Sequence, residues 1–272
     1  MMGDEANART EFRYDLPIEG GKPVWVREGE WKYVAPILAW LRAPLEIEIA
    51  PGATLANDSF VVGPTFAESL GFQVRLFHAL HGPSESLSKK PFEFALEIAA
   101  RDAGFEASIA QSATSPGADI VIGGSGFSVK TEAGRTTSRD VVFLTKLMES
   151  AWTKNLNSPE QFLHGLRNDV LARVLQADRT LVWRCHGRLS GSAKEAEYEL
   201  LEIPKSFWEA LSSVEAADFS PITRAGSTSA PVKLNGQQIY TISFDGSDQK
   251  IQVRSLAVSR CVFHGRWRLR AP

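Results

Sequence analysis

The apolar and polar positions of the chain predict several helices in its middle part. Residues 64–82 (PTFAESLGFQVRLFHALHG) predict one helix, because Pro lies near the start and Gly follows the end. Residues 88–104 (SKKPFEFALEIAARDAG) predict a second one, with Ser at the N-cap, Pro in the first turn and Gly at the stop. Two further segments are expected to be helical, namely the amphipathic stretch 138–152 and the stretch 158–176, which opens with Ser-Pro-Glu.

Shorter runs predict strands around these helices. Residues 105–111 predict a strand, and a hairpin of residues 118–122 and 127–132 follows it. Helices and strands alternate in the middle of the chain, which indicates an α/β fold with a mixed central β-sheet flanked by helices. The other expected strands lie at 22–34, 179–189 and 196–204, and extra β-hairpins are expected at the C-terminus, with a turn at Asn235-Gly236.

The chain is expected to form a single domain over residues 1–272. Its 272 residues suffice for one large domain or two small ones, and either can bury a core. The stretch 226–231 (GSTSAP) is the one candidate linker, and it is short. We therefore divide one domain into an N-terminal part at 1–85, a core at 86–180 and a β-rich part at 181–272.

Composition is that of an ordinary globular protein, with 43% apolar and 23% charged residues. No apolar run approaches the roughly 20 residues that span a bilayer, and the N-terminus has no apolar signal core, so we expect a cytoplasmic protein without a membrane partner. Cys185 and Cys261 are expected to be reduced thiols. The net charge of −2 gives no global case for nucleic acid, but the segment after Asp248 carries basic charges only. Such a segment can bind phosphate or can simply be a strand with solvated arginines.

The stretch 116–135 (PGADIVIGGSGFSVKTEAGR) carries the most informative pattern. If residues 123–126 form the loop, Asp119 pairs with Lys130, and alternation along each strand places Ser128 on the same face as this pair. The opposite face is apolar and can pack on the core. An isolated pair of this kind is often only a cross-strand ion pair on a solvated edge.

The residues PGAD…FSVK resemble the active-site hairpin of the PD-(D/E)xK superfamily, which contains most type II restriction endonucleases. In this resemblance Asp119 matches the metal-binding aspartate and Lys130 matches the catalytic lysine, within a restriction-endonuclease-like core. Ser128 stands where most of the family has an acid, and a neutral hydroxyl is a poor Mg²⁺ ligand. Restriction enzymes that cut around a CCGG core also carry Ser-x-Lys, and they take the missing carboxylate from a helix.

The expected helix 88–104 offers two replacement acids. Glu93 and Glu97 lie four residues apart and therefore share one face. Glu93 is the first choice, because it follows Phe92 in the "FE" context that similar enzymes have. The alternative is a surface strip in which Glu97 pairs with Arg101.

The resemblance implies a Mg²⁺-dependent, sequence-specific endonuclease that hydrolyses double-stranded DNA to 5′-phosphate ends. Asp119 and Glu93 would hold Mg²⁺, while Lys130 would orient water and offset charge on the phosphate. A palindromic site would imply a homodimer, with catalysis in 86–180 and DNA recognition in 181–272. Candidate base-reading residues, which must reach the major groove, are Arg184, Arg188, Arg254, Arg260, Arg266 and Arg268.

Two other functions stay open at this point. The chain could be a repair or recombination nuclease of the same fold, or a non-catalytic DNA-binding or structural module in which Asp119 and Lys130 form only a salt bridge. Incubating DNA with the protein and Mg²⁺ separates the three, because they yield discrete bands, a smear or intact DNA.

Overall fold

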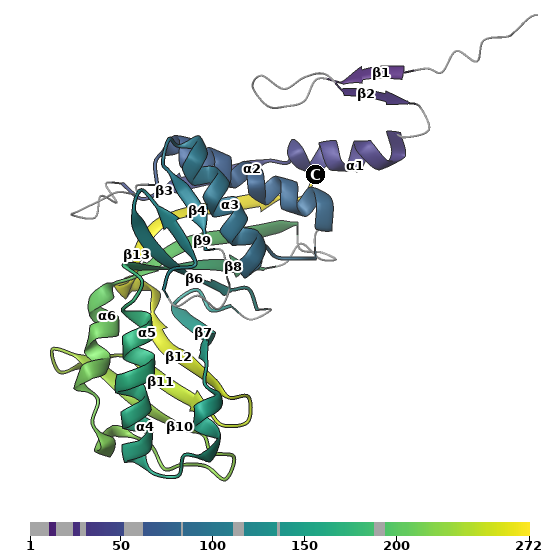
Figure 1. Ribbon diagram of the computed structural model, residues 1–272. Coiled ribbons are helices and arrows are strands. Elements are labelled where there is room, and N and C mark those ends of the chain that lie inside the picture. Colours follow the sequence, from purple (N-terminus) through teal and green to yellow (C-terminus); the bar gives the residue numbers. More distant parts are fainter. Residues whose placement is uncertain are drawn as a thin grey trace, which may run out of the picture.

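The computed structural model describes residues 11–14, 24–27, 31–51, 62–82, 84–110, 117–134, 137–187 and 194–272 (Figure 1). Near the N-terminus, β1 (Glu11–Tyr14) and β2 (Val24–Arg27) pair as an antiparallel ribbon. The remaining strands form two sheets of seven and four strands. The structure thus confirms the mixed α/β fold class.

The larger sheet is mixed, because β6 and β8 pair in parallel while its other neighbours are antiparallel. In sheet order its strands are β3 (Leu45–Ile49), β13 (Val262–Arg270), β9 (Glu195–Ile203), β8 (Arg179–His186), β6 (Ser125–Glu132), β5 (Ile120–Ile122) and β4 (Ala107–Ile109). The strand predictions at 105–111, 179–189 and 196–204 are therefore confirmed.

Helices α2 (Pro64–His81) and α3 (Lys89–Asp102) cover one face of the larger sheet, and α1 (Trp31–Leu41) packs beside α2 (Figure 1). Both helices predicted at 64–82 and 88–104 are thus confirmed. An aromatic stack fills the layer between helices and sheet, with Phe92 4.6 Å from Trp183 and Trp183 5.1 Å from Tyr198 between ring centroids. This stack fixes α3 against the middle of the sheet.

The smaller sheet is antiparallel and carries a second apolar core. Its order is β10 (Thr228–Leu234), β11 (Gln237–Asp245), β12 (Lys250–Ala257) and β7 (Val141–Glu149). A helix predicted at 158–176 packs on it and consists of α4 (Pro159–Gly165), a π-helical segment (Leu166–Leu171) and α5 (Ala172–Val174). Ser158 caps this helix by accepting a hydrogen bond from the backbone N–H of Gln161. The short helix α6 (Lys205–Glu209) lies nearby.

The prediction of a helix at 138–152 is wrong, because this segment forms strand β7. Two extra residues bulge out of β7 where it pairs with β12, since Leu144 faces Val253 while Met148 faces Ile251. The bulge brings Leu144, Leu147 and Met148 to the core. Their spacing of three and four residues imitates a helical period.

The C-terminal hairpin prediction is confirmed in part. β10 and β11 join through Asn235 and Gly236, whose φ angles of 52° and 76° are those of a type I′ turn. β12 and β13, however, do not form a hairpin, because β13 crosses into the larger sheet between β3 and β9. Strand β10 begins within the segment 226–231. The strand expected at 22–34 is confirmed in part, because the stretch contains β2 and also the start of α1. Among the described residues, no helix has both the length and the apolar character needed to cross a membrane.

The face of the larger sheet that lies away from α2 and α3 carries alternating charges across five strands. Cross-strand neighbours follow one another in the order Glu132, Arg184, Glu199, Arg266 and Glu48. A parallel row contains His186, Glu197, Arg268 and Glu46. Opposite charges therefore face each other at nearly every step, which stabilises this register. We call these two rows the charge ladder.

Arg184 is the centre of the charge ladder and is fully buried. Its guanidinium donates hydrogen bonds to Glu132 at 2.9 Å and Glu199 at 3.1 Å, and also to the carbonyls of Ser138 and Val141. One buried cation thus joins β6, β8, β9 and the beginning of β7. A buried charge is tolerated only when its partners satisfy it, so these four acceptors are required together.

We predict that acid destabilises the fold through Glu199. Burial alone raises its pKa, but hydrogen bonds from His186 and Arg266 and the nearby charge of Arg184 lower the pKa from 4.5 to about 2. Because the folded-state pKa is depressed, the stabilisation is complete above the unfolded-state pKa and is lost as pH falls toward 2. The shift corresponds to about 3 kcal/mol of unfolding free energy. Urea unfolding between pH 2 and 7 measures it.

The matched variants are Glu199→Gln and Glu195→Gln. The first should lower the free energy of unfolding at pH 7 by about 3–5 kcal/mol, because it leaves buried cations uncompensated, and this difference should shrink as pH falls. The second removes an exposed partner of Arg270 and should cost at most about 1 kcal/mol. Equal stability of Glu199→Gln and wild type at pH 7 contradicts this role of Glu199.

Candidate active site

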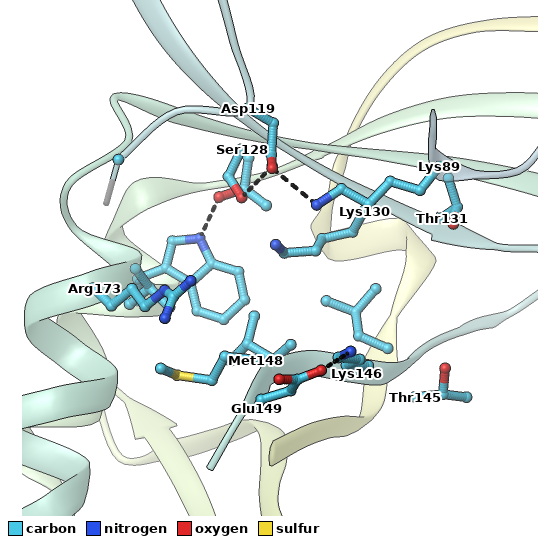
Figure 2. A pocket seen from close by; sticks show the side chains of 16 residues that line it. Lys89, Asp119, Ser128, Lys130, Thr131, Thr145, Lys146, Met148, Glu149 and Arg173 are labelled. Atoms are coloured by element: carbon cyan, nitrogen blue, oxygen red, sulfur yellow. Dashed lines mark hydrogen bonds and ion pairs between the residues drawn. The ribbon is translucent and has the colours of Figure 1, made fainter. Parts of the chain in front are cut away.

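A cleft of about 670 Å³ lies between β6 of the larger sheet, β7 of the smaller sheet and helix α5 (Figure 2). Residues from both sheets line it, and so does the first turn of α3. The charged and hydroxyl-bearing side chains in its lining include Lys89, Asp119, Ser128, Lys130, Lys146, Glu149 and Arg173. The hairpin residues singled out by the sequence therefore lie in one concave site.

The hairpin is tighter than the sequence indicated. Its turn consists of Gly123 and Gly124, whose φ angles of 56° and 85° fit the type I′ geometry that only a few residue types adopt readily. Ile120 faces Phe127 and the backbone N–H of Asp119 donates to the carbonyl of Phe127, so the predicted pairing of Asp119 with Lys130 is wrong. The two registers differ by two residues, and side chains alternate with a period of two. Asp119, Ser128 and Lys130 consequently share one face, as expected.

The Asp119 carboxylate is held from three directions. Its Oδ2 accepts hydrogen bonds from the backbone N–H of Val129 at 2.6 Å and from Ser128 Oγ at 3.2 Å, and its Oδ1 accepts one from Lys89 Nζ at 2.8 Å. Burial alone raises the pKa of Asp119, but the charge of Lys130 and the hydrogen bonds from Lys89 and Val129 outweigh it, and the pKa lies below its ordinary value. Asp119 is therefore an oriented, ionised acid.

Lys130 extends its amine into the middle of the cleft (Figure 2). Among the described residues, no side chain accepts a hydrogen bond from its Nζ or forms an ion pair with it. Burial, together with the positive charge of Lys89, lowers the pKa of Lys130 to about 8, although Asp119 opposes this shift. Lys130 is thus a cation at neutral pH, poised within reach of deprotonation.

Glu93 lies next to Asp119, with Lys89 between them. Lys89 Nζ is 2.8 Å from Asp119 Oδ1 and 3.7 Å from Glu93 Oε1, so the two carboxylate oxygens are at most 6.5 Å apart. Glu93 is only 3% exposed, and Lys90 Nζ approaches its Oε2 at 2.9 Å. The structure therefore brings Glu93 and Asp119 to one cation.

Glu97 takes no part in this cluster. It forms an ion pair with Arg101 at 2.7 Å, whereas Glu93 shares Lys89 with Asp119, and neither glutamate is among the residues that line the cleft. The alternative of a surface pair therefore holds for Glu97. Glu132, the other acid near Lys130 in the sequence, bonds to Arg184 in the charge ladder.

Five of the six candidate DNA-binding arginines are described by the structure, and they fall into three groups. Arg184 is fully buried, so its expected contact with bases is corrected to a structural role. Arg266 and Arg268 belong to the charge ladder and are bonded to Glu199 at 2.7 Å and Glu197 at 2.8 Å. Arg254 and Arg260 are exposed near the smaller sheet, where Arg254 bonds to Gln252 and Arg260 to Gln237. Arg188 lies outside the described residues.

A second group of buried ligand-type side chains lies in the charge ladder. His186, Glu197 and Glu199 place one potential ligand atom each within 4.8 Å of one another. Their oxygens, however, are already bonded to guanidinium groups, as described above, and His186 Nε2 lies 2.8 Å from Glu199. The carboxylates of this group are therefore already bonded to arginine side chains of the charge ladder. Both cysteines are free, as expected.

Sequence reasoning missed four charged residues of the cleft, namely Lys89, Lys146, Glu149 and Arg173. A signal was present for Lys89. Lys89 and Lys90 occupy the first turn of α3, where the helix dipole disfavours cations. Two lysines at this position indicate nearby anions, which the fold supplies as Glu93 and Asp119. The others come from elements distant in sequence, and no local pattern marks them.

Comparison with known proteins gives information that is independent of this geometry. The family described as "SmaI: Type II site-specific deoxyribonuclease" matches residues 47–269. A curated relative, the type II restriction enzyme SmaI of Serratia marcescens, is 28% identical over 204 residues, which cover 72% of this chain and 77% of the relative. No solved structure matches.

Proposed function

The chain belongs to the SmaI family of type II site-specific deoxyribonucleases, which cleave DNA, and we propose that the cleft around Asp119 and Lys130 is its catalytic centre. The observation that carries this proposal is the meeting of Asp119, Lys130 and Glu93 in one place. They come from a hairpin and a helix, and a single lysine connects the two acids. An ordinary surface ion pair does not require side chains from separate elements to lie this close together.

The site fits the Ser-x-Lys variant of the PD-(D/E)xK superfamily, and we assign the chain to this superfamily. In support, Asp119 precedes β5 and Ser128 and Lys130 lie on β6, with all three side chains on one face. Ser128 donates a hydrogen bond to Asp119, so it supports the acid instead of supplying a second one.

Mg²⁺ is the proposed cofactor, with Asp119 and Glu93 as the residues that hold it. The donor set fits, because both are carboxylates and Mg²⁺ prefers oxygen ligands. Their oxygens, at most 6.5 Å apart, already share one cation in the form of the Lys89 ammonium. The chemistry that Mg²⁺ supplies when bound is polarisation of the scissile phosphate and a lowered pKa of water.

The protein's own groups account for the rest of the mechanism. The Val129 N–H and Ser128 hydroxyl fix the Asp119 carboxylate so that its orientation costs nothing during the reaction. Lys130, charged at neutral pH, orients the attacking water and offsets the negative charge that develops on the phosphate. Hydrolysis in this arrangement leaves a 5′-phosphate and a 3′-hydroxyl.

Recognition of double-stranded DNA is assigned to residues outside the charge ladder. Arg254 and Arg260 are the remaining described candidates for base contacts, since both are exposed and each bonds to a neutral side chain. We further propose a homodimer, in which two copies of the cleft act on the two strands of a palindromic site.

The first test of the proposed centre is Lys130→Ala. Cleavage of DNA in Mg²⁺ should be abolished, because the charge that stabilises the transition state is lost. Specific binding, measured in Ca²⁺ to prevent cleavage, should persist. Asp119→Asn should behave likewise, while Lys154→Ala, outside the cleft lining, is the control. Cleavage by Lys130→Ala at the wild-type rate refutes the assignment.

The second test addresses the acid that replaces the usual family carboxylate. Glu93→Ala should abolish cleavage or raise the Mg²⁺ concentration it requires, because one carboxylate binds Mg²⁺ weakly. Glu97→Ala is the matched control, since Glu97 lies on the same helix but pairs with Arg101. Single-turnover cleavage at a series of Mg²⁺ concentrations gives the comparison.

Restoring an acid on the hairpin completes this test. Ser128→Glu in the Glu93→Ala background should recover part of the activity, because position 128 is where most of the superfamily keeps its carboxylate. An equal effect of Glu93→Ala and Glu97→Ala removes Glu93 from the metal site.

The third test separates the exposed arginines from the charge ladder. Arg254→Ala should weaken specific DNA binding by about 1–3 kcal/mol if this side chain reads a base. Arg266→Ala should leave the affinity of the folded protein unchanged and lower its melting temperature, because Glu199 and Glu48 lose a partner. Binding titrations in Ca²⁺ and thermal unfolding measure both effects, and the reverse pattern contradicts this division of roles.

A further inference from the structure

Arg173 reaches into the cleft from the end of a helix that the proposed mechanism does not use. It lies in α5 directly after the π-helical segment Leu166–Leu171, and its side chain lines the same cleft as Lys130 (Figure 2). The helix belongs to the smaller sheet's layer, whereas Lys130 belongs to the larger sheet. Arg173 therefore brings positive charge to the site from the other side.

The cations of the cleft differ in whether they have partners. Lys89 is bonded to Asp119, and Lys146 forms an ion pair with Glu149. The Arg173 guanidinium makes no hydrogen bond or ion pair with any residue that the structure describes. Its charge nevertheless acts on Lys130, whose pKa it helps to lower. Arg173 and Lys130 thus have no direct partner among the described residues, although the charge of Asp119 acts on Lys130 and the charge of Arg173 acts on Glu149 across the cleft.

The π-helical segment explains why Arg173 faces the cleft. Phe162 is buried in the second core, and Arg173 follows it after eleven residues. In a regular α-helix eleven residues rotate by about three turns plus 20°, which would point Arg173 into the core with Phe162. A π turn, with its i→i+5 hydrogen bonds, adds about one residue and shifts later side chains by roughly 100°.

The same π segment keeps the apolar stripe of the helix intact. Leu166 and Val170 stay buried beside Phe162, although Arg173 is exposed. π segments are less stable than α-helix and often occur at functional sites. Here the irregularity has one evident result, which is the direction of Arg173.

We propose that Arg173 binds a phosphate of the DNA strand in the cleft, next to the phosphate on which Asp119 and Lys130 act. This inference rests on the proposed function of the cleft. The planar guanidinium can donate two parallel hydrogen bonds to phosphate oxygens, which positions the strand as well as neutralising it. The scissile strand is then held by the larger sheet on one side and by helix α5 on the other.

The experiment compares Arg173→Ala, Arg173→Lys and the control Arg224→Ala, in which an exposed arginine outside the cleft lining is removed. DNA binding in Ca²⁺ is measured at several salt concentrations below the melting temperature of each variant. Arg173→Ala should bind DNA about ten- to a hundredfold more weakly, because it lacks one pair of charge-assisted hydrogen bonds. It should also reduce the slope of log K against log salt by about 0.9, the release of one counterion.

Arg173→Lys should keep the salt slope but lose part of the affinity, because lysine retains the charge and lacks the two-pronged geometry. Arg224→Ala should match wild type in both respects. Wild-type affinity and slope for Arg173→Ala overturn the proposal.

Lys130→Ala, measured in parallel for cleavage, distinguishes a failure of the Arg173 proposal from a failure of the proposed catalytic centre. If Lys130→Ala is inactive while Arg173→Ala binds and cuts like wild type, only the role of Arg173 fails. If Lys130→Ala still cuts, the cleft itself is misassigned and Arg173 has no phosphate to bind there.

Discussion

The buried guanidinium of Arg184 is the interaction on which the cleft depends. It bonds to Glu132, two residues beyond Lys130 on β6, and to the carbonyl of Val141, the first residue of β7. The two walls of the cleft are therefore joined at a single side chain. Because a buried guanidinium must keep its acceptors, neither strand can shift without leaving a charge or a carbonyl unpaired. The hydrogen bonds of Arg184 therefore determine the distance between Lys130 and the opposite wall of the cleft.

The alternation of side chains in the larger sheet extends this constraint to the proposed catalytic residues. On β8, Trp183 enters the aromatic core under α3, while its neighbour Arg184 points to the opposite face. Parallel pairing with β6 places Ser128 and Lys130 on that second face too. Packing of one face of the sheet thus determines which side chains lie on the other face. A strand cannot move one side chain to the opposite face without moving all the others.

Predictions from the sequence were correct where the local hydrophobic period determines the structure. They were wrong where pairing with strands distant in the sequence determines it. The faces of the hairpin were predictable although its register was not, because a shift of two residues leaves each side chain on its face. The helix expected at 138–152 failed because pairing with β12 imposes a bulge that the segment itself does not reveal. The acid-free C-terminus was visible, but its partners Glu197 and Glu199 lie about seventy residues away, so Arg266 and Arg268 resembled a phosphate-binding surface. The acid at Glu93 was predictable from its context, whereas Lys89 and Arg173 required the fold.

The position of Ser128 gives a physical reason for splitting the acids of this site between hairpin and helix. The Ser128 side chain lies within hydrogen-bond distance of Asp119, so a carboxylate at residue 128 would face another carboxylate, which raises the pKa of one of them. A serine instead donates a hydrogen bond to Asp119 and adds no second negative charge. The second acid, Glu93, approaches from α3 on the far side of Lys89, so the two negative charges are separated by a cation. The arrangement brings the two acids close together on either side of one ammonium group, as the proposed divalent-ion site with a single hairpin carboxylate requires.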